Sequence, residues 1–147
     1  MRILSPAERK KVLKKLNELY GVEKLNYLLL KFGKDKLRLY SGSLTQDDLY
    51  KLKHTLRLEN VGIYFAREDR DEIRLTFDSL FLFENEIRKN ILDIDDEQLK
   101  EWMKGNELAI SGDKGFVIIR NKGNLYGTGK STGEKITNYV PRERRIR

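Results

Sequence analysis

The sequence contains no cysteine and a single histidine, His54. Without cysteine the chain cannot form a disulfide framework, a zinc–thiolate or iron–sulfur site, or a cysteine nucleophile. One histidine excludes a multi-histidine metal site and leaves His54 as the sole candidate base of a Ser-His-Asp arrangement. These absences exclude several of the common catalytic and metal-binding classes.

Long apolar stretches are also missing. No run approaches the roughly 18–20 apolar residues that a membrane span needs. Residues 1–6 lack the apolar segment of a signal peptide. We therefore expect a soluble protein of the cytoplasm with no membrane partner. High lysine and glutamate content, without cysteine and with little glutamine, is also typical of thermophiles.

Positive charge is in excess, and the excess lies late in the sequence. Residues 1–97 hold 19 basic and 18 acidic side chains, whereas residues 98–147 hold 11 and 5. Four arginines stand among the final six residues. Such a run can be a solvated, disordered tail. Because arginine pairs phosphate through two hydrogen bonds and stacks on bases, it favours a nucleic-acid partner.

The N-terminal part predicts a mixed α/β domain. Ser5 and Glu8 form the pattern of a capping box, and Gly21 can end the helix that follows. The basic residues at positions 9–15 of this helix are interpreted as a solvated face, with a membrane surface as the alternative. The further expected elements are strands at 27–32, 36–40, 61–66 and 72–77, a helix from Thr45 to about Arg57 with Leu56 on its apolar stripe, and a short helix at 78–84. The charged link at 67–71 predicts a hairpin.

The C-terminal part predicts a small barrel. Asp95 and Gln98 form a second capping pattern, before a helix with Leu99, Trp102 and Met103 on one face. Short strands separated by glycines are expected at 87–92, 107–110, 115–120, 125–130 and 135–140. The sequence thus predicts an α+β protein with two domains, residues 1–84 and 85–147.

Two motifs imitate known ligand loops. The segment Gly127–Gly133 contains Gly-Lys-Ser, but a phosphate loop needs a glycine where Asn124 stands and a helix afterwards. Asp93–Glu97 begins like a calcium loop, yet its sixth residue is Gln98 and its twelfth is Lys104. We interpret the first as a barrel strand and the second as helix capping.

Four segments of the C-terminal part are distinctive: Trp102–Leu108, Gly115–Ile119, Leu125–Lys130 and Asn138–Arg145, with Leu-x-Gly-x-Gly and Pro-Arg-x-Arg-Arg the most specific motifs. In these segments the chain resembles the PUA-type RNA-binding domain at the C-terminus of Nop/Sun-family RNA cytosine methyltransferases. The order of elements also resembles the two-domain Nip-type ribosome-biogenesis proteins, in which an α/β domain precedes a PUA domain. The resemblance implies a PUA-like β pseudobarrel. Methyl transfer does not carry over, because the cysteine nucleophiles and the S-adenosylmethionine domain are missing.

The resemblance implies a non-catalytic RNA-binding protein of ribosome biogenesis or of rRNA or tRNA modification, without cofactor or metal. Phosphate contacts are expected from Lys130, Lys135, Arg142, Arg144 and Arg145, and next from Lys100, Lys104 and Arg147. Tyr139 or Tyr126 could stack an unpaired base, although barrel core is the favoured interpretation of Tyr126. The alternative function is a protein-interaction adaptor of a ribosome-assembly or RNA-modifying complex with only nonspecific RNA affinity.

Overall fold

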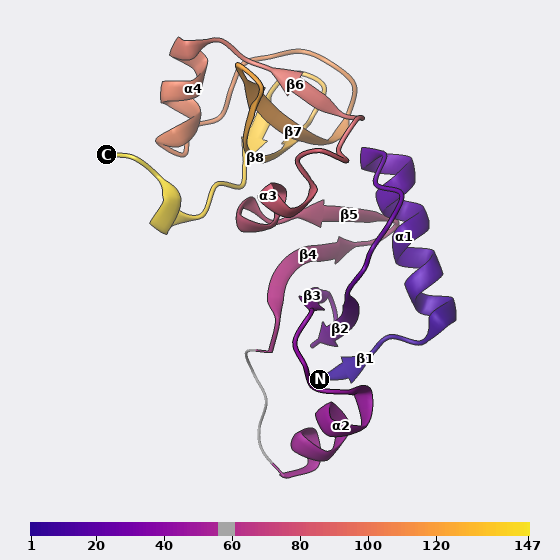
Figure 1. Ribbon diagram of the computed structural model, residues 1–147. Helices are drawn as coiled ribbons and strands as arrows, with labels where there is room; N and C mark the ends of the chain where they lie inside the picture. The colour runs from indigo at the N-terminus through magenta and orange to yellow at the C-terminus, as the bar shows by residue number, and fades with distance from the viewer. Residues whose placement is uncertain (56–60) are drawn as a thin grey trace. The chain divides into compact units, whose positions relative to one another are not determined.

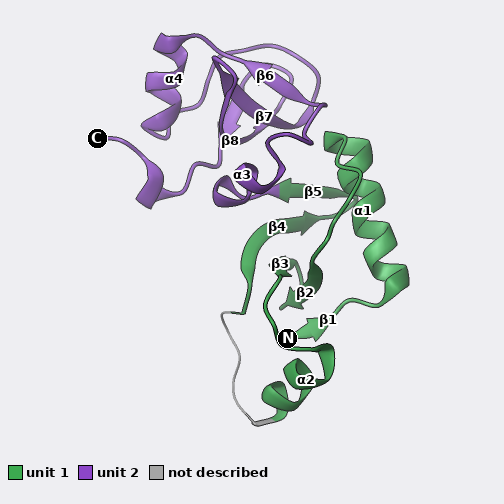
Figure 2. Cartoon of the chain, in the orientation of Figure 1, with its two compact units in different colours: residues 1–74 green, residues 75–147 purple. Residues whose placement is uncertain are grey.

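The computed structural model describes residues 1–55 and 61–147 of the chain, with the side chain of Thr55 excepted. Two compact units are present, unit 1 from Met1 to Arg74 and unit 2 from Leu75 to Arg147 (Figure 2). Each contains helices and a sheet (Figure 1), which confirms the α+β class. Across the described residues, no helix has the length and apolar character to cross a membrane.

Unit 1 is built on a five-stranded sheet with the strands in sequence order, β1-β2-β3-β4-β5. Its first three pairings, β1–β2, β2–β3 and β3–β4, are antiparallel. The elements are β1 (Arg2–Ile3), α1 (Pro6–Tyr20), β2 (Leu28–Phe32), β3 (Lys36–Tyr40), α2 (Gln46–Thr55), β4 (Ile63–Asp69) and β5 (Glu72–Leu75). Alternating apolar residues give the sheet its buried side chains, including Leu30, Leu37 and Phe65. Burial of each contributes roughly 1.5–3 kcal/mol to stability.

Helix α1 begins and ends where its sequence predicts. The Ser5 side chain accepts a hydrogen bond from the backbone N–H of Glu8, and the Glu8 carboxylate accepts one from the backbone N–H of Ser5. Gly21 ends the helix with a left-handed φ of 80°. The inward face buries Val12, Leu16 and Tyr20, so the apolar stripe of α1 is used inside unit 1.

The capping carboxylate of Glu8 makes unit 1 sensitive to acid. Its hydrogen bond from the Arg2 side chain, with a further one from the Ser5 backbone, lowers the pKa of Glu8 from 4.5 to about 2. A lowered folded-state pKa stabilises the fold above the unfolded pKa, and this contribution disappears as the pH falls toward 2. We expect the free energy of unfolding to fall between about pH 5 and pH 2, and to fall less steeply in Glu8→Gln. Urea unfolding at a series of pH values measures both slopes, and equal slopes would contradict the assignment.

The structure of unit 1 corrects the prediction at two places and leaves part of one helix prediction untested. Strand β1 was not predicted, because two residues carry no period; it forms by pairing Arg2 with Lys31 and Ile3 with Leu30. The hairpin link is shorter than residues 67–71, since β4 continues to Asp69 and Arg70 turns with a φ of 56°. Helix α2 is described to residue 55; the part of the prediction that concerns Leu56 and Arg57 lies outside the described residues.

Unit 2 contains a four-stranded sheet of order β6-β7-β8-β9. Strand β6 pairs with β7 in parallel, and the other pairs are antiparallel. Helix α4 lies in the connection between β6 and β7 (Figure 1). The elements are the 3-10 turns η1 (Phe77–Ser79) and η2 (Arg142–Arg144), the helices α3 (Leu80–Phe83) and α4 (Asp96–Met103), and the strands β6 (Ile91–Asp93), β7 (Gly115–Asn121), β8 (Asn124–Ser131) and β9 (Ile136–Asn138).

Trp102 lies in the core of unit 2, where it is 0% exposed. It clusters with apolar residues that include Ile119 and Ile136. Its indole N–H donates a 2.7 Å hydrogen bond to the backbone carbonyl of Tyr126. The Asn138 side-chain amide donates a 2.7 Å hydrogen bond to the backbone carbonyl of Trp102, near the end of α4, where carbonyls lack helical partners. Trp102 therefore joins α4 to the sheet and is not available to stack a base.

The two glycines of the Leu-x-Gly-x-Gly segment have structural roles in β8. The β7–β8 register shifts where Tyr126 and Gly127 together face Ile119, and Gly127 adopts a φ of 109°. A Cβ on Gly129 would stand 2.8 Å from the Trp102 ring and 2.5 Å from Ile136. The whole Gly127–Ser131 stretch is strand, followed by a turn and β9. This confirms the barrel-strand interpretation over a phosphate loop.

Three strand predictions in unit 2 extend beyond the observed strands, and one of them is the strand expected at 135–140, which is β9 at Ile136–Asn138. Residues 107–110 pair with β9 only through one isolated bridge, from Leu108 to Ile136. The glycines and charged residues that follow do not extend this bridge into a strand. Strand β6 begins at Ile91, since Asn90 adopts a left-handed φ of 55°.

The compact units divide ten residues before the domain boundary that we placed at 84/85. The reason lies in contacts made by the intervening residues. Thr128 donates a 2.9 Å hydrogen bond to the Leu75 carbonyl, and Phe77 packs on the Trp102 cluster. The functional division into residues 1–84 and 85–147 stays a proposal.

Candidate nucleic-acid interface

The net charge of the two structural units differs from the charge distribution along the sequence. Residues 1–74 hold 17 basic and 11 acidic side chains, net +6, and residues 75–147 hold 13 and 12, net +1. Seven acidic residues between positions 75 and 97 fold into the same unit as the basic C-terminal third. Unit 2 is therefore nearly neutral, and any attraction of a polyanion to it must come from local groups of cations.

The first such group surrounds the ring of Phe116 in β7. Lys130 lies opposite Phe116 in the ladder, and its ammonium nitrogen is 4.8 Å from the ring centroid. Tyr139 meets the same ring edge-on, with centroids 6.2 Å apart. Lys130 and Tyr139 are both partly exposed. The structure thus brings two of the predicted contact residues together, as a cation next to an aromatic pair.

The second group is the C-terminal segment, residues 141–147. This segment is not a free tail, because the backbone N–H of Ile146 donates a 2.8 Å hydrogen bond to the carbonyl of Met103 at the end of α4. The Arg145 Nε donates 3.0 Å to the Val140 carbonyl. A Cβ on Gly105 would lie 2.6 Å from that same nitrogen, so glycine makes room for the arginine. The segment is held against the C-terminal end of α4.

The four C-terminal arginines differ in their tasks. Arg145 holds the segment in place through Val140. Arg144 forms an exposed 3.0 Å ion pair with Asp78, which is worth little in water and can be exchanged for a phosphate. Arg142 and Arg147 are exposed, and neither has an acidic partner among the described residues. All four arginines are exposed, and Arg142, Arg144 and Arg147 are those whose side chains do not hold the segment itself.

The other predicted lysines, Lys100, Lys104 and Lys135, are paired with carboxylates. Lys100 lies 3.5 Å from Glu97, and Lys104 lies 3.2 Å from Glu101. Lys135 lies 2.8 Å from Glu107, and this contact raises the pKa of the lysine. The hydrogen bonds from Asn106 and Lys104 lower the pKa of Glu101. Lys100 lies in α4 and Lys104 directly follows it, near the docked segment, whereas Lys135 lies elsewhere, in the turn before β9.

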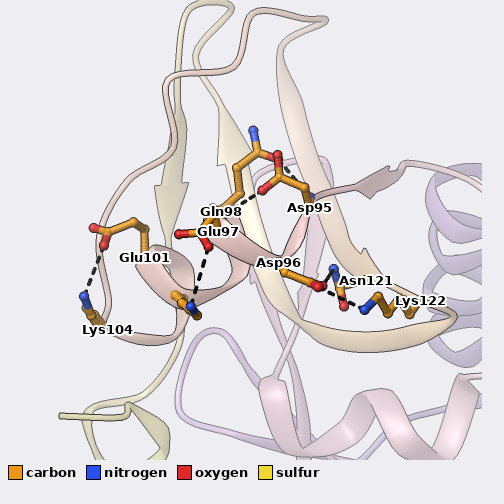
Figure 3. A network of polar contacts seen from close by, with 9 residues as sticks. Asp95, Asp96, Glu97, Gln98, Glu101, Lys104, Asn121 and Lys122 are labelled. Atoms are coloured by element: carbon orange, nitrogen blue, oxygen red, sulfur yellow. Dashed lines mark hydrogen bonds and ion pairs between the residues drawn. The ribbon is translucent and has the colours of Figure 1, made fainter.

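The acidic residues that precede and begin α4 have structural partners (Figure 3). Asp95 accepts a 2.7 Å hydrogen bond from the backbone N–H of Gln98, which completes the second capping box. Asp96 accepts hydrogen bonds from Lys122, at 2.9 Å, and Asn121, at 3.1 Å, and both lower its pKa. In the described ranges, no three His, Asp or Glu side chains are placed to hold a metal ion. The helix-capping interpretation of this stretch is therefore supported over a calcium loop.

Phe116 is the residue that sequence reasoning missed. A two-residue turn at Lys122–Gly123 would pair Lys130 with Gly115, but the bulge at Tyr126–Gly127 moves the register by one and pairs Lys130 with Phe116. Gly127 lies inside the strand predicted at 125–130, and a glycine within a strand is a sequence signal for a bulge. Tyr126 packs on the Trp102 cluster, which supports its interpretation as core.

A family model agrees with this geometry. Residues 89–146 match the model described as the methyltransferase RsmF PUA domain. That range contains α4, the whole β7–β9 sheet region and nearly all of the docked segment. The similarity of the C-terminal part to a PUA domain of the Nop/Sun type is thereby confirmed.

Individual relatives match more of the chain. The ribosomal RNA small subunit methyltransferase F of Vibrio vulnificus YJ016 is 30% identical over 89 residues, 60% of this chain and 19% of that protein. The same enzyme of Psychromonas ingrahamii is 29% identical over 107 residues, 68% of this chain and 22% of that protein. The chain thus spans about a fifth of the length of the curated relatives it matches.

A solved structure shares the fold of both parts. The hypothetical protein of the hyperthermophilic archaeon Pyrococcus horikoshii OT3 aligns with a TM-score of 0.59 and 13% sequence identity. The alignment covers 95% of this chain and 92% of that protein. At this identity the likeness concerns fold alone.

Proposed function

We propose that this protein binds RNA through unit 2, without catalysing a reaction itself, in the maturation or modification of ribosomal RNA. The observation that carries the proposal is the match of residues 89–146 to the PUA domain of a ribosomal RNA methyltransferase family. The relatives act on small-subunit ribosomal RNA by name. The proposed context of this chain is the same class of RNA.

The proposed contacts divide into two kinds. Arg142, Arg144 and Arg147 neutralise backbone phosphates and release the counterions held by the RNA. Lys100 lies on α4 and Lys104 at its C-terminal cap, next to the arginine segment, and their carboxylate partners are exposed enough to be exchanged for phosphate. Lys135 is a more remote phosphate contact. Arg145 acts by keeping the segment against α4.

The cluster of Lys130, Phe116 and Tyr139 supplies the second kind of contact. The Tyr139 ring and the Lys130 ammonium group both contact the ring of Phe116. An unpaired base can stack on such a ring while the cation contacts the adjoining phosphate. We infer that this cluster receives a single-stranded or looped nucleotide, because the bases of a duplex are already stacked.

The absence of catalysis is part of the proposal. The matched portion of the relatives is their PUA domain. This chain lacks cysteine, so it cannot supply the nucleophile on which the Nop/Sun methyltransferases depend. We propose that RNA recognition is the activity that remains.

Binding across a salt series tests the proposal. The purified full chain is titrated with a small-subunit ribosomal RNA fragment, a transfer RNA, a single-stranded RNA and duplex DNA, each from about 50 to 200 mM salt. We expect at least tenfold tighter binding to one RNA than to duplex DNA at the highest salt. Base and shape contacts persist when phosphate contacts weaken, so a specific reader keeps this preference. Equal, steeply salt-dependent binding to all four would overturn specific RNA recognition.

The adaptor alternative has one observation in its favour. Leu44, Tyr50 and Ile63 of unit 1 are 39–42% exposed, and exposed large apolar side chains can serve as protein contacts. The adaptor function predicts equal, steeply salt-dependent binding to all four nucleic acids. A folded partner would then have to bind unit 1 and lose affinity when Tyr50 or Ile63 is replaced by serine.

A further inference from the structure

Four lysines lie close together on α1 of unit 1. Lys10, Lys11 and Lys14 are exposed and Lys15 is partly exposed. Lys10 and Lys14, like Lys11 and Lys15, are four residues apart, so each pair stands one above the other at a rise of about 6 Å. Unit 1 also carries the larger net charge of the two units, +6. We call these four residues the α1 lysine face.

The four lysines lower the stability of α1. Like charges at a spacing of four destabilise a helix by about 0.2–0.5 kcal/mol per pair. The helix dipole favours cations only in the last turn, where α1 has none. Among the four, and within the described residues, only Lys14 has a carboxylate partner, Glu18 at 3.9 Å. The stability of α1 therefore gives no reason for the arrangement, and an external polyanion does.

The buried side of α1 distinguishes between polyanions. A helix that lies on a membrane must insert its apolar face below the headgroups. The apolar face of α1 is already in the core of unit 1, where Val12, Leu16 and Tyr20 are at most 3% exposed. The exposed large apolar residues of the described chain all lie outside α1. What α1 offers is charge without an apolar anchor, which fits a nucleic-acid backbone better than a lipid surface.

We propose that the α1 lysine face is a second RNA-binding surface, which contacts backbone phosphates independently of unit 2. This inference rests on the proposed function, since RNA is the polyanion that unit 2 recognises. Flexible ammonium groups act as point charges that follow phosphates without reading bases. The face thus adds affinity and salt dependence, and unit 2 supplies the preference among RNAs.

The test replaces all four lysines by glutamine in the full chain. Each phosphate contact contributes about 0.7–0.9 to the slope of log affinity against log salt. Loss of three or four contacts therefore lowers the slope by about 2–4 and weakens binding at least tenfold at 100 mM salt. The preference among RNAs stays unchanged. Removing like-charge pairs does not destabilise α1, so the variant keeps its fold, which urea unfolding verifies.

A matched control removes four exposed lysines elsewhere, Lys24, Lys34, Lys89 and Lys114. The inference predicts a slope change below about 1 for this control. Equal losses in the two variants would show a general charge effect and overturn it. Vesicles of anionic phospholipid provide a further arm: vesicle binding that depends on the four lysines, with RNA binding unaffected, would assign the face to membranes instead. If the unit 2 arginines matter and α1 does not, only this inference fails and the proposed function stands.

Discussion

Trp102→Ala is expected to lower the free energy of unfolding of unit 2 by about 3–5 kcal/mol. The indole is 0% exposed and packs on residues from the sheet and the C-terminal strand, among them Ile119, Ile136 and Val140. Its removal leaves a cavity and also deprives the Tyr126 carbonyl of its 2.7 Å partner. Since a whole domain is stable by only about 5–15 kcal/mol, this loss leaves unit 2 marginally folded.

The measurement needs a probe that is specific to unit 2. Trp102 is the only tryptophan, so its fluorescence reports this unit in the wild type but is lost in the variant. Amide hydrogen exchange followed by mass spectrometry gives protection for β7 and β8 in both proteins. Trp102→Phe serves as the comparison, because it keeps an aromatic ring but loses the N–H donor and part of the ring volume, so its loss of stability should be smaller than that of Trp102→Ala. A loss below 1 kcal/mol in Trp102→Ala would contradict the central role of this residue.

Replacing Arg142, Arg144 and Arg147 together by glutamine is expected to produce the largest change in RNA binding by unit 2. Loss of three phosphate contacts lowers the slope of log affinity against log salt by about 2–3 and weakens binding at least tenfold at 100 mM salt. All RNAs should weaken similarly, because phosphate contacts carry no sequence information. The ion pair of Arg144 with Asp78 is exposed on both sides, so its loss costs little stability.

Arg145 is kept in this variant for a structural reason. Its contacts with Val140 and the space above Gly105 hold the segment. If Arg145 were also replaced, weaker binding could come either from lost phosphate contacts or from release of the segment, and the two causes could not be separated. The matched control carries Arg88→Gln, Lys89→Gln and Lys114→Gln, which remove the same charge from exposed positions of unit 2. Titration of a ribosomal RNA fragment across the salt series compares the two. An unchanged slope in the arginine variant would exclude the C-terminal segment from the interface.

Local signals in the sequence were sufficient for the helices and most strands. Ser5 with Glu8 and Asp95 with Gln98 predicted both capping boxes, because the reciprocal hydrogen bonds depend on residues only three apart. Lys36–Tyr40 was predicted with its observed bounds, since alternation has a period of two. Strand β1 was missed because only its pairing with β2 makes two residues a strand.

The candidate site was less predictable, because it depends on contacts between distant residues. The role of Phe116 depends on a bulge that shifts the register of β8 by one residue. The docking of the arginine segment depends on the hydrogen bond from Ile146 to Met103 and on the placement of the Arg145 side chain at Val140 and Gly105, and nothing in a charged terminus indicates these contacts. The charge count along the chain also misled, since the acidic residues at 75–97 share a unit with the basic third. Sequence order does not show which charges become neighbours.

The short outer strands of both sheets have a consequence for association between chains. The outer strands of unit 1 are β1 and β5, of two and four residues, and those of unit 2 are β6 and β9, of three residues each. A sheet edge recruits another chain through its row of unpaired N–H and C=O groups, and brief edges present few of them. Edge-to-edge polymerisation is thus disfavoured in both units. A basic protein gathered at high density along an RNA can then remain a set of separate molecules, even where the RNA brings many copies together.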